Sequence, residues 1–282
     1  MKKVLILFVM TVLMANLCYS QADKRVTYKQ IDTIDLFLDV YYPEEYKTTC
    51  THPAMVFFFG GGWRSGATKQ FEPHAKYFSG RGMVCFLADY RVSTRHQTTP
   101  FESLRDAKSA IRYIRKHAEK FHVNPDSIVA SGGSAGGHLA AATGLVDGFN
   151  DSSDDLSVSC KPNALVLFNP VIDNGPGGYG YERLGERYKD FSPLHNIHKG
   201  AAPTIFFLGT EDDLIPVETA RYCQTVMEKL GSRCELVLYE GEGHGFFNYG
   251  SRYNYWQTVL RADAFLRSLG YITSEPDILI NP

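Results

Sequence analysis

Six short apolar runs constrain the fold of this chain more than any other feature of its sequence. Each run is an almost continuous stretch of hydrophobic residues, as is typical of parallel strands that are covered on both faces. Other stretches carry apolar residues at a period near 3.6, as amphipathic helices do. This alternation predicts an α/β fold with a mostly parallel, doubly wound sheet and helices on both faces. The predicted strands are residues 54–59, 83–88, 127–130, 164–168, 204–208 and 235–239, and the clearest helical patterns are residues 101–121, 217–230 and 255–269.

Flanking segments complete the predicted organisation. Residues 26–31 and 34–42 alternate in polarity like the strands of a hairpin, with Asp32 and Thr33 at the turn. Residues 173–199 form the one long insertion, which follows residues 164–168, the sixth predicted strand when the two hairpin strands are counted, and we expect it to form a lid or a rim. A length of 282 residues suits one large α/β domain or two small ones, and a hydrophobic content of 44% can fill a substantial core; we place a single domain at residues 21–282.

The stretch Gly132-Gly133-Ser134-Ala135-Gly136 matches the G-x-S-x-G pattern of a nucleophile elbow. It comes directly after the apolar run 127–130 and before the helix-like residues 139–142. A serine on such a strand-to-helix turn has a strained backbone and an exposed hydroxyl group, and glycines remove the Cβ atoms that would clash there. The sequence therefore predicts a serine hydrolase with Ser134 as its nucleophile. The alternative interpretation is that Ser134 is only a turn residue of a packed α/β protein.

The same glycines do not indicate a nucleotide site. A phosphate-binding loop needs a lysine and then Ser or Thr after its last glycine, whereas His138 and Leu139 follow Gly137. The dinucleotide pattern G-x-G-x-x-G also fails, because Ser65 stands three residues after Gly62. With 29 Lys and Arg against 31 Asp and Glu, the formal charge of −2 gives no general electrostatic case for a nucleic acid partner.

A glycine loop, Gly60-Gly61-Gly62, follows the first apolar run. Ligands of doubly wound sheets bind at the carboxyl ends of the strands, so this loop is expected at the site. The main-chain amides of Gly61, Gly62 and Ala135 are candidates for an oxyanion hole, which would bind the negative oxygen of a tetrahedral intermediate. Trp63, next to the loop, is interpreted either as a substrate-binding platform for a sugar or as a packing residue.

Carboxylates and a histidine follow two later runs. Glu211, Asp212 and Asp213 come after residues 204–208, and one of them is expected to orient a histidine. His244 lies between glycines after residues 235–239, in a loop from which its ring could reach Ser134. Serine, acid and histidine then occur in the chain order of α/β-hydrolases, each after a strand.

Three other histidines are weaker candidates for the site. His138 is the nearest rival base in the sequence, but its place on the helix after the elbow favours a structural role. His195 and His198, in the insertion, are candidates to line a substrate pocket.

Together these segments resemble an α/β-hydrolase of the bacterial esterase and lipase group related to hormone-sensitive lipase, close to secreted carbohydrate esterases such as acetyl xylan esterases. The resemblance covers roughly residues 39–269. It implies that Asp212, rather than Asp213, completes a triad with Ser134 and His244. It rests on Gly60-Gly61-Gly62-Trp63, Asp89-Tyr90-Arg91, the elbow, Gly209-Thr210-Glu211-Asp212 with Ile215-Pro216, and Gly243-His244-Gly245-Phe246.

Two departures from the family pattern matter. The family usually has a histidine before the three glycines, and this chain has Phe59, so another group must supply any hydrogen bond that orders the loop. The lipases of the group also carry a long N-terminal cap, whereas this chain enters its first strands soon after residue 21. A more open site is therefore expected, suited to bulky or polymeric substrates.

The triad and the resemblance predict a secreted serine carboxylic ester hydrolase that works through an acyl-enzyme. We expect it to remove acetyl or other short acyl groups from plant polysaccharide or small esters. A feruloyl esterase and a secreted serine peptidase of the same fold are alternatives, and a non-catalytic carbohydrate-binding protein is disfavoured because all three triad members are present. No metal-ligand spacing such as H-E-x-x-H occurs, so no metal or other cofactor is expected. The sequence does not indicate an oligomeric state.

The N-terminal residues predict export. A basic start, Met1-Lys2-Lys3, precedes a short apolar core, as in a signal peptide of residues 1–20 that is cleaved near Gln21. This core is about half of the roughly 20 residues that a membrane helix needs, so no stable membrane insertion is expected. A lipoprotein site at Cys18 is disfavoured because Leu17 stands where a small residue would be expected. We therefore expect the protein in the periplasm or outside the cell.

Five cysteines follow the predicted signal peptide. An exported protein can form disulfides, and an odd number leaves at least one thiol free or paired between chains. Cys223 and Cys234, on a predicted helix and the next strand, are candidates for a disulfide.

Overall fold

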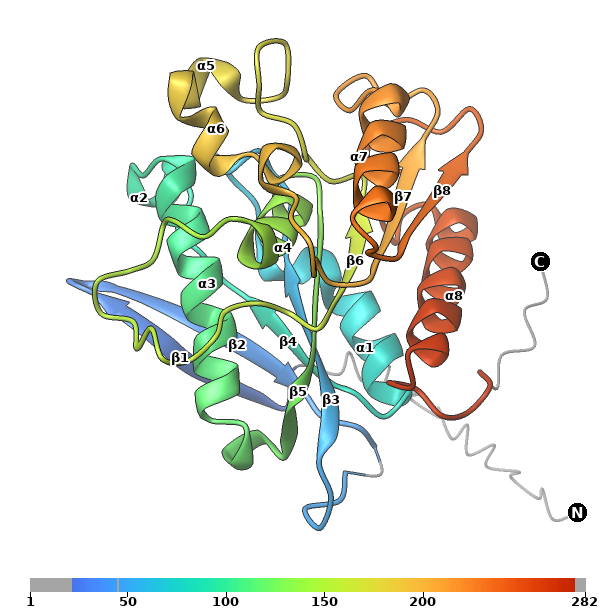
Figure 1. The fold of residues 1–282 in the computed structure, drawn as a ribbon. Coiled ribbons are helices and arrows are strands. Elements are labelled where there is room, and N and C mark those ends of the chain that lie inside the picture. The colour runs from blue at the N-terminus through green and yellow to red at the C-terminus, as the bar shows by residue number, and fades with distance from the viewer. Residues whose placement is uncertain (1–21, 45, 277–282) are drawn as a thin grey trace, which may run out of the picture.

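An eight-stranded sheet forms the centre of the computed structural model, which describes residues 22–44 and 46–276 (Figure 1). The strand order is β1-β2-β4-β3-β5-β6-β7-β8. β2 pairs antiparallel with β1 and β4, and all other neighbours are parallel. Both the mostly parallel sheet and the N-terminal hairpin are thus confirmed. The strands are β1 Lys24–Ile31, β2 Ile34–Tyr41, β3 His52–Phe58, β4 Val84–Ala88, β5 Val123–Gly133, β6 Ala164–Phe168, β7 Thr204–Gly209 and β8 Cys234–Tyr239.

Helices cover both faces of this sheet, as predicted. α3 (Pro100–Lys116), α4 (Ala135–Leu145) and α7 (Val217–Lys229) pack on one face, while α1 (Glu72–Gly80) and α8 (Arg252–Ser268) pack on the other (Figure 1). α1 has no counterpart among the predicted helical patterns. The helix predicted over residues 101–121 ends earlier than expected, because the chain leaves the α-helix after Lys116 and makes a 3-10 turn, Glu119–Phe121. This turn brings the buried ring of Phe121 against Phe86, with ring centroids 5.1 Å apart.

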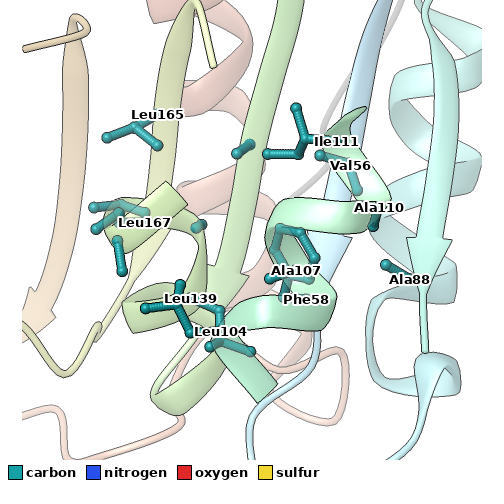
Figure 2. Close-up of a cluster of buried hydrophobic side chains, with 14 of the residues drawn as sticks. Val56, Phe58, Ala88, Leu104, Ala107, Ala110, Ile111, Leu139, Leu165 and Leu167 are labelled. Carbon is teal, nitrogen blue, oxygen red and sulfur yellow. The ribbon is translucent and has the colours of Figure 1, made fainter. Parts of the chain in front are cut away.

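The start of α3 is fixed by its own sequence. Thr99 and Glu102 form a capping box, and Pro100 occupies the first turn, where a missing N–H costs nothing. Leu104, Ala107 and Ile111 then follow at helical spacing and are fully buried against the sheet (Figure 2). Full burial of a leucine or isoleucine side chain stabilises a fold by about 1.5–3 kcal/mol. The opposing side chains in Figure 2 include Val56 and Phe58 from β3, Ala88 from β4, Leu139 from α4, and Leu165 and Leu167 from β6.

The insertion follows β6, the sixth strand, as predicted. It contains the single helical turns α5 (Tyr181–Leu184) and α6 (Tyr188–Phe191). Figure 1 shows both at the end of the sheet where β7 and β8 terminate, which is the end at which the glycine loop and the elbow also lie. The insertion is therefore placed beside the carboxyl ends of the strands.

The predictions for the N-terminal segment concern residues 1–21, which precede the described part of the chain. The signal peptide of residues 1–20, Cys18 and the cleavage near Gln21 all lie outside the described residues. Among the described helices, none has the length and apolar character needed to cross a membrane.

Cys223 and Cys234 are buried free thiols, so the candidate disulfide is not formed in this structure. Burial raises the pKa of both thiols, that of Cys223 to about 12, which keeps them protonated and unreactive.

Candidate active site

Ser134 lies at the turn between β5 and α4, with φ 54° and ψ −121°. Few residues other than glycine adopt such a conformation, and its strain is typical of a functional site. The turn forms because Gly136 has no side chain: a Cβ there would lie 2.0 Å from the carbonyl oxygen of Phe58. The Ser134 main-chain N–H donates to the Phe168 carbonyl at 3.0 Å and ties the turn to β6. The half-buried Ser134 side chain is thereby held at the carboxyl edge of the sheet.

His244 lies in the loop after β8, and both of its ring nitrogens have partners. Nε2 is 2.9 Å from Ser134 Oγ, and Nδ1 is 2.8 Å from Asp212 Oδ2. A carboxylate can only accept a hydrogen bond, so Nδ1 carries the proton and Nε2 has a free lone pair for the serine hydroxyl. The structure therefore joins the three predicted triad residues in one hydrogen-bonded chain.

Asp212 follows β7, and its side chain is fully buried. Its Oδ1 accepts hydrogen bonds from the main-chain amides of Leu214 and Ile215 at 2.9 and 3.0 Å, which fixes the carboxylate in place. Asp213 is exposed and forms no hydrogen bond or ion pair with any described residue. The fold thus brings Asp212, and not its neighbour, to the histidine.

The glycine loop runs beside the serine, since a Cβ on Gly60 would lie 3.4 Å from Ser134 Cβ. Gly61 and Gly62 have φ values of 122° and 63°, which suit glycine far better than other residues. Within the described part of the chain, the amides of Gly61, Gly62 and Ala135 donate to no protein acceptor. Ala135 also begins α4, whose N-terminus favours negative charge. These free donors next to Ser134 are what an oxyanion hole requires.

Trp63 does not form an accessible sugar platform, which corrects the substrate-binding prediction for this residue. Only 1% of it is exposed. Its ring packs edge-on against His138 and Phe191, with centroids 5.0 and 5.9 Å away, and the Arg183 guanidinium lies 5.2 Å from its centroid. The insertion supplies Phe191 and Arg183, so segments distant in the sequence cover the ring.

His138 has a structural role, as predicted. It is fully buried and stacks on Phe191 with ring centroids 4.3 Å apart, and its Nε2–H donates to the Phe191 carbonyl at 3.2 Å. Burial lowers the pKa of His138 to about 3, which keeps the ring neutral at ordinary pH. Its ring connects α4 to the insertion and forms no hydrogen bond with a triad side chain, although its main-chain N–H donates to the Ser134 carbonyl at 3.0 Å in the first turn of α4.

The insertion touches the glycine loop and lines a cavity next to it. Arg183 donates from Nη1 to the Gly62 carbonyl at 2.6 Å, and the Tyr179 hydroxyl occupies the space that a Cβ on Gly62 would need. The cavity has a volume of about 520 Å³. His195 and His198, which were candidate pocket residues, do not line it. The lining residues are Arg64, Ser93, Gly177, Gly178, Tyr179, Gly180, Glu182, Arg183, Asp213 and Leu214.

Three carboxamide side chains at the site were missed by the sequence analysis. Asn169 is fully buried at the end of β6, where its Oδ1 accepts from the Gly245 amide at 3.1 Å and its Nδ2 lies 3.4 Å from His244 Nε2. Its position after a strand was a usable signal. Gln70 and Asn248 connect the glycine loop with the histidine loop, and neither follows a strand. In the described part of the chain, no three His, Cys, Asp or Glu side chains gather as a metal site would require.

Sequence comparisons relate this chain to hydrolase families and to esterases. Residues 38–176 match the BD-FAE family, and residues 177–271 match the dienelactone hydrolase family. Esterase LipC of Mycobacterium tuberculosis is 29% identical over 69% of this chain and 53% of its own length. An acetylxylan esterase of Xylanibacter ruminicola is 25% identical over 74% of this chain and 44% of its own length. The chain thus spans about half the length of the curated relatives it matches.

Comparison with solved structures gives a fuller match. Thermogutta terrifontis esterase 2 phosphoramylated by tabun has a TM-score of 0.86 and 46% sequence identity, covering 89% of this chain and 96% of that one. The butyrate-bound form of the same esterase has a TM-score of 0.86 and 44% identity, covering 90% of this chain and 97% of that one. The match therefore extends over nearly the whole described fold.

Proposed function

The chain belongs to the α/β-hydrolase esterases, and from this premise we propose that it is an exported serine esterase that removes acetyl or other short acyl groups through an acyl-enzyme. The observation that carries the proposal is the hydrogen-bonded chain from Asp212 through His244 to Ser134. Each link is 2.8 to 2.9 Å long and involves the atoms that proton transfer requires.

The proposed reaction has two halves. In the first, His244 Nε2 takes the proton of Ser134 Oγ as the oxygen attacks the ester carbonyl, and the protonated ring then gives that proton to the leaving alcohol. In the second, His244 takes a proton from the water that attacks the acyl-enzyme carbonyl, and the ring returns this proton to Ser134 Oγ as the bond between Oγ and the acyl group breaks and the acid is released. The buried Asp212 carboxylate holds the ring in the required tautomer and stabilises its positive form.

The oxyanion hole is proposed to use the amides of Gly61, Gly62 and Ala135. They are fixed main-chain donors, so they need no rearrangement when negative charge develops on the substrate oxygen. Loss of one such donor typically lowers turnover by about 10² to 10³. Proline is the only residue that lacks a main-chain N–H, and because it fixes φ near −65° it would also distort the loop at Gly61 and Gly62, whose φ values are 122° and 63°.

The cavity lined by the insertion is proposed to bind a polar alcohol group, since Arg64 after the glycine loop and Asp213 after the triad acid also line it. Charged and polar side chains, including Arg64, Glu182 and Asp213, contribute to its lining. The Thermogutta esterase has been solved with propionate and with butyrate bound, and one relative is an acetylxylan esterase. These observations support short acyl groups on a carbohydrate or another small polar alcohol. Feruloyl esters are bulkier alternatives.

Export is part of the proposal and is supported by the signal-like residues 1–20. Expression of the full chain in a bacterium, followed by N-terminal sequencing of the periplasmic or secreted product, tests it. A mature N-terminus near Gln21 is expected, and an intact Met1 in an exclusively cytoplasmic product would contradict it.

Activity is tested with Ser134→Ala and with Ser157→Ala, which changes a serine in an exposed loop and serves as the control. We expect Ser134→Ala to lower turnover of p-nitrophenyl acetate by about 10⁶ while Ser157→Ala retains it. A series of p-nitrophenyl esters of rising chain length, run beside acid release from acetylated xylan, measures acyl and alcohol preference. Faster cleavage of aminoacyl-p-nitroanilides than of any ester would instead identify a peptidase.

A further inference from the structure

We propose that Gln70 and Asn248 are positioning residues that couple the glycine loop to the histidine loop. The two side chains form a relay of carboxamides between the donors that would bind the oxyanion and the base that would activate the serine. The proposal rests on the function proposed above. It predicts that a change on one side of the site is transmitted to the other.

The relay consists of three hydrogen bonds. The Gly60 main-chain N–H donates to Gln70 Oε1 at 2.6 Å, and Gln70 Nε2 donates to Asn248 Oδ1 at 2.9 Å. Asn248 Nδ2 then donates to the Gly245 carbonyl at 2.8 Å. One end of the relay is one residue before Gly61, and the other is one residue after His244. Each end is therefore adjacent to a group with a proposed catalytic role.

The direction of the relay is fixed by chemistry. A main-chain N–H can only donate, so Gln70 must turn its oxygen toward Gly60 and its NH₂ group toward Asn248. Asn248 must then accept with its oxygen, which leaves its NH₂ group for the Gly245 carbonyl. Only a side chain with an acceptor at one end and a donor at the other fits either position. This explains why amides, and not carboxylates, occupy both.

Other contacts show that the two connected loops are anchored where the relay meets them. The peptide group between Phe59 and Gly60 is held on its other side, since the Tyr90 hydroxyl donates to the Phe59 carbonyl at 2.6 Å. Phe59 itself stacks on Tyr90, with ring centroids 4.0 Å apart, and its side chain has no hydrogen-bonding group. Gln70 therefore supplies the side-chain contact to the loop amide that Phe59 cannot make.

The histidine loop has a matching arrangement at Gly245, whose φ is 88°. Its N–H donates to Asn169 Oδ1 and its carbonyl accepts from Asn248. A glycine backbone has many accessible conformations, so these two anchors restrict where the preceding His244 can lie. Because misplacement of a catalytic group by about 1 Å can lower the rate about 10²-fold, loss of the relay should act on turnover.

The first test uses the shape-retaining variant Gln70→Met, the variant Asn248→Ala and the double variant. Each single change is expected to lower kcat for p-nitrophenyl butyrate by about 10- to 100-fold with KM changed by less than about threefold. The double variant should be no slower than about twice the worse single one, because both changes break the same unit. Single variants within about twofold of the wild type, or losses that multiply in the double variant, would refute the coupling.

A second test uses Gln70→Glu, which nearly preserves size but places a carboxylate opposite the Asn248 oxygen. When protonated, the glutamic acid can accept from Gly60 and donate to Asn248, so kcat relative to the wild type should rise as pH falls from about 8 to 5. Lys69→Glu adds a neighbouring exposed charge outside the relay and should give a flat ratio. A flat ratio for Gln70→Glu, or the same slope for Lys69→Glu, would argue against the relay.

A third readout does not depend on catalysis. Hydrogen exchange of the Gly60 amide should accelerate in Asn248→Ala, although that amide donates to Gln70 and not to Asn248, and an unchanged exchange rate would count against the proposal. Loss of the proposed function would appear separately, as a wild-type protein with no more esterase activity than Ser134→Ala. Circular dichroism melting curves confirm that each variant compared is folded.

Discussion

The carboxylate of Asp212 meets Nδ1 of His244 with both oxygens, at 2.8 and 3.1 Å. Replacing one oxygen by NH₂ in Asp212→Asn keeps the shape but offers a donor where the ring needs an acceptor, which favours the wrong tautomer. We expect kcat for p-nitrophenyl acetate to fall by about 10⁴.

Asp213→Asn is the matched control, since it makes the same chemical change on the adjacent exposed residue. Its turnover of p-nitrophenyl acetate, whose leaving group has no sugar hydroxyls for the cavity that Asp213 helps to line, should stay within about twofold of the wild type. Equal losses in the two variants would show that the acid of the triad has been misassigned.

The tendency of residues that follow parallel strands to meet at one edge of the sheet explains which parts of the site were predictable. In a parallel sheet covered on both faces, buried strands read as apolar runs, and the residues after them meet at one edge. Ser134, Asp212 and His244 each follow such a run, so their meeting could be predicted without knowing any loop conformation. Asn169 also directly follows a strand, but an asparagine in a turn belongs to no catalytic motif and so was not predicted.

The remaining features depend on contacts that leave no local pattern. The burial of Trp63 comes from Phe191 and Arg183, which lie in an insertion whose path the sequence does not indicate. Gln70 and Asn248 are 178 positions apart, and neither belongs to a periodic segment or a recognised motif. Their pairing arises from tertiary packing alone, so a single sequence carries no signal for it.

Two buried histidines predict that the fold loses stability in acid. Burial lowers the pKa of His74 and of His138 to about 3, compared with about 6.5 in an unfolded chain. As pH falls, the unfolded chain takes up these protons first, so stability that is fully present above about pH 6.5 is lost progressively down to about pH 3. The loss is on the order of a few kcal/mol for each histidine.

His74→Phe isolates one of these contributions. The ring lies among aromatic residues, 4.8 Å from Tyr255 and 4.9 Å from Phe71 between centroids, and neither nitrogen has a hydrogen-bond partner within the described structure. Phenylalanine should fit this environment and remove the acid-labile group. Urea unfolding at pH 5 and pH 7.5 should give a smaller difference in unfolding free energy for His74→Phe than for the wild type.

The control for His74→Phe is His122→Asn, at a half-buried loop residue whose φ of 49° asparagine tolerates well. It should retain the wild-type difference between the two pH values. If His74→Phe also retained that difference, the acid sensitivity would have to come from other groups.

Trp63→Phe distinguishes packing from sugar binding. A buried ring contributes through its contacts, so the variant should be less stable by about 1 to 3 kcal/mol because of the cavity left by the smaller ring. Activity on acetylated xylan and on p-nitrophenyl acetate should then change by the same factor. A selective loss on xylan, with p-nitrophenyl acetate hydrolysis intact, would restore the platform interpretation.

Gly136→Ala tests the geometry of the elbow itself. A Cβ at this position would lie 2.0 Å from the Phe58 carbonyl oxygen, and both groups belong to the backbone, so neither can rotate away. Relief requires α4 to move off β3, which would also displace Ser134, and we expect the loss of several kcal/mol of stability, on the order of 4, together with activity. Gly80→Ala, at the last residue of α1 with open space around it, is the control and should be neutral or stabilising by up to about 1 kcal/mol. Melting curves and p-nitrophenyl acetate turnover measure both, and a Gly136→Ala protein as stable and active as Gly80→Ala would mean that the elbow is not packed as tightly as the fold requires.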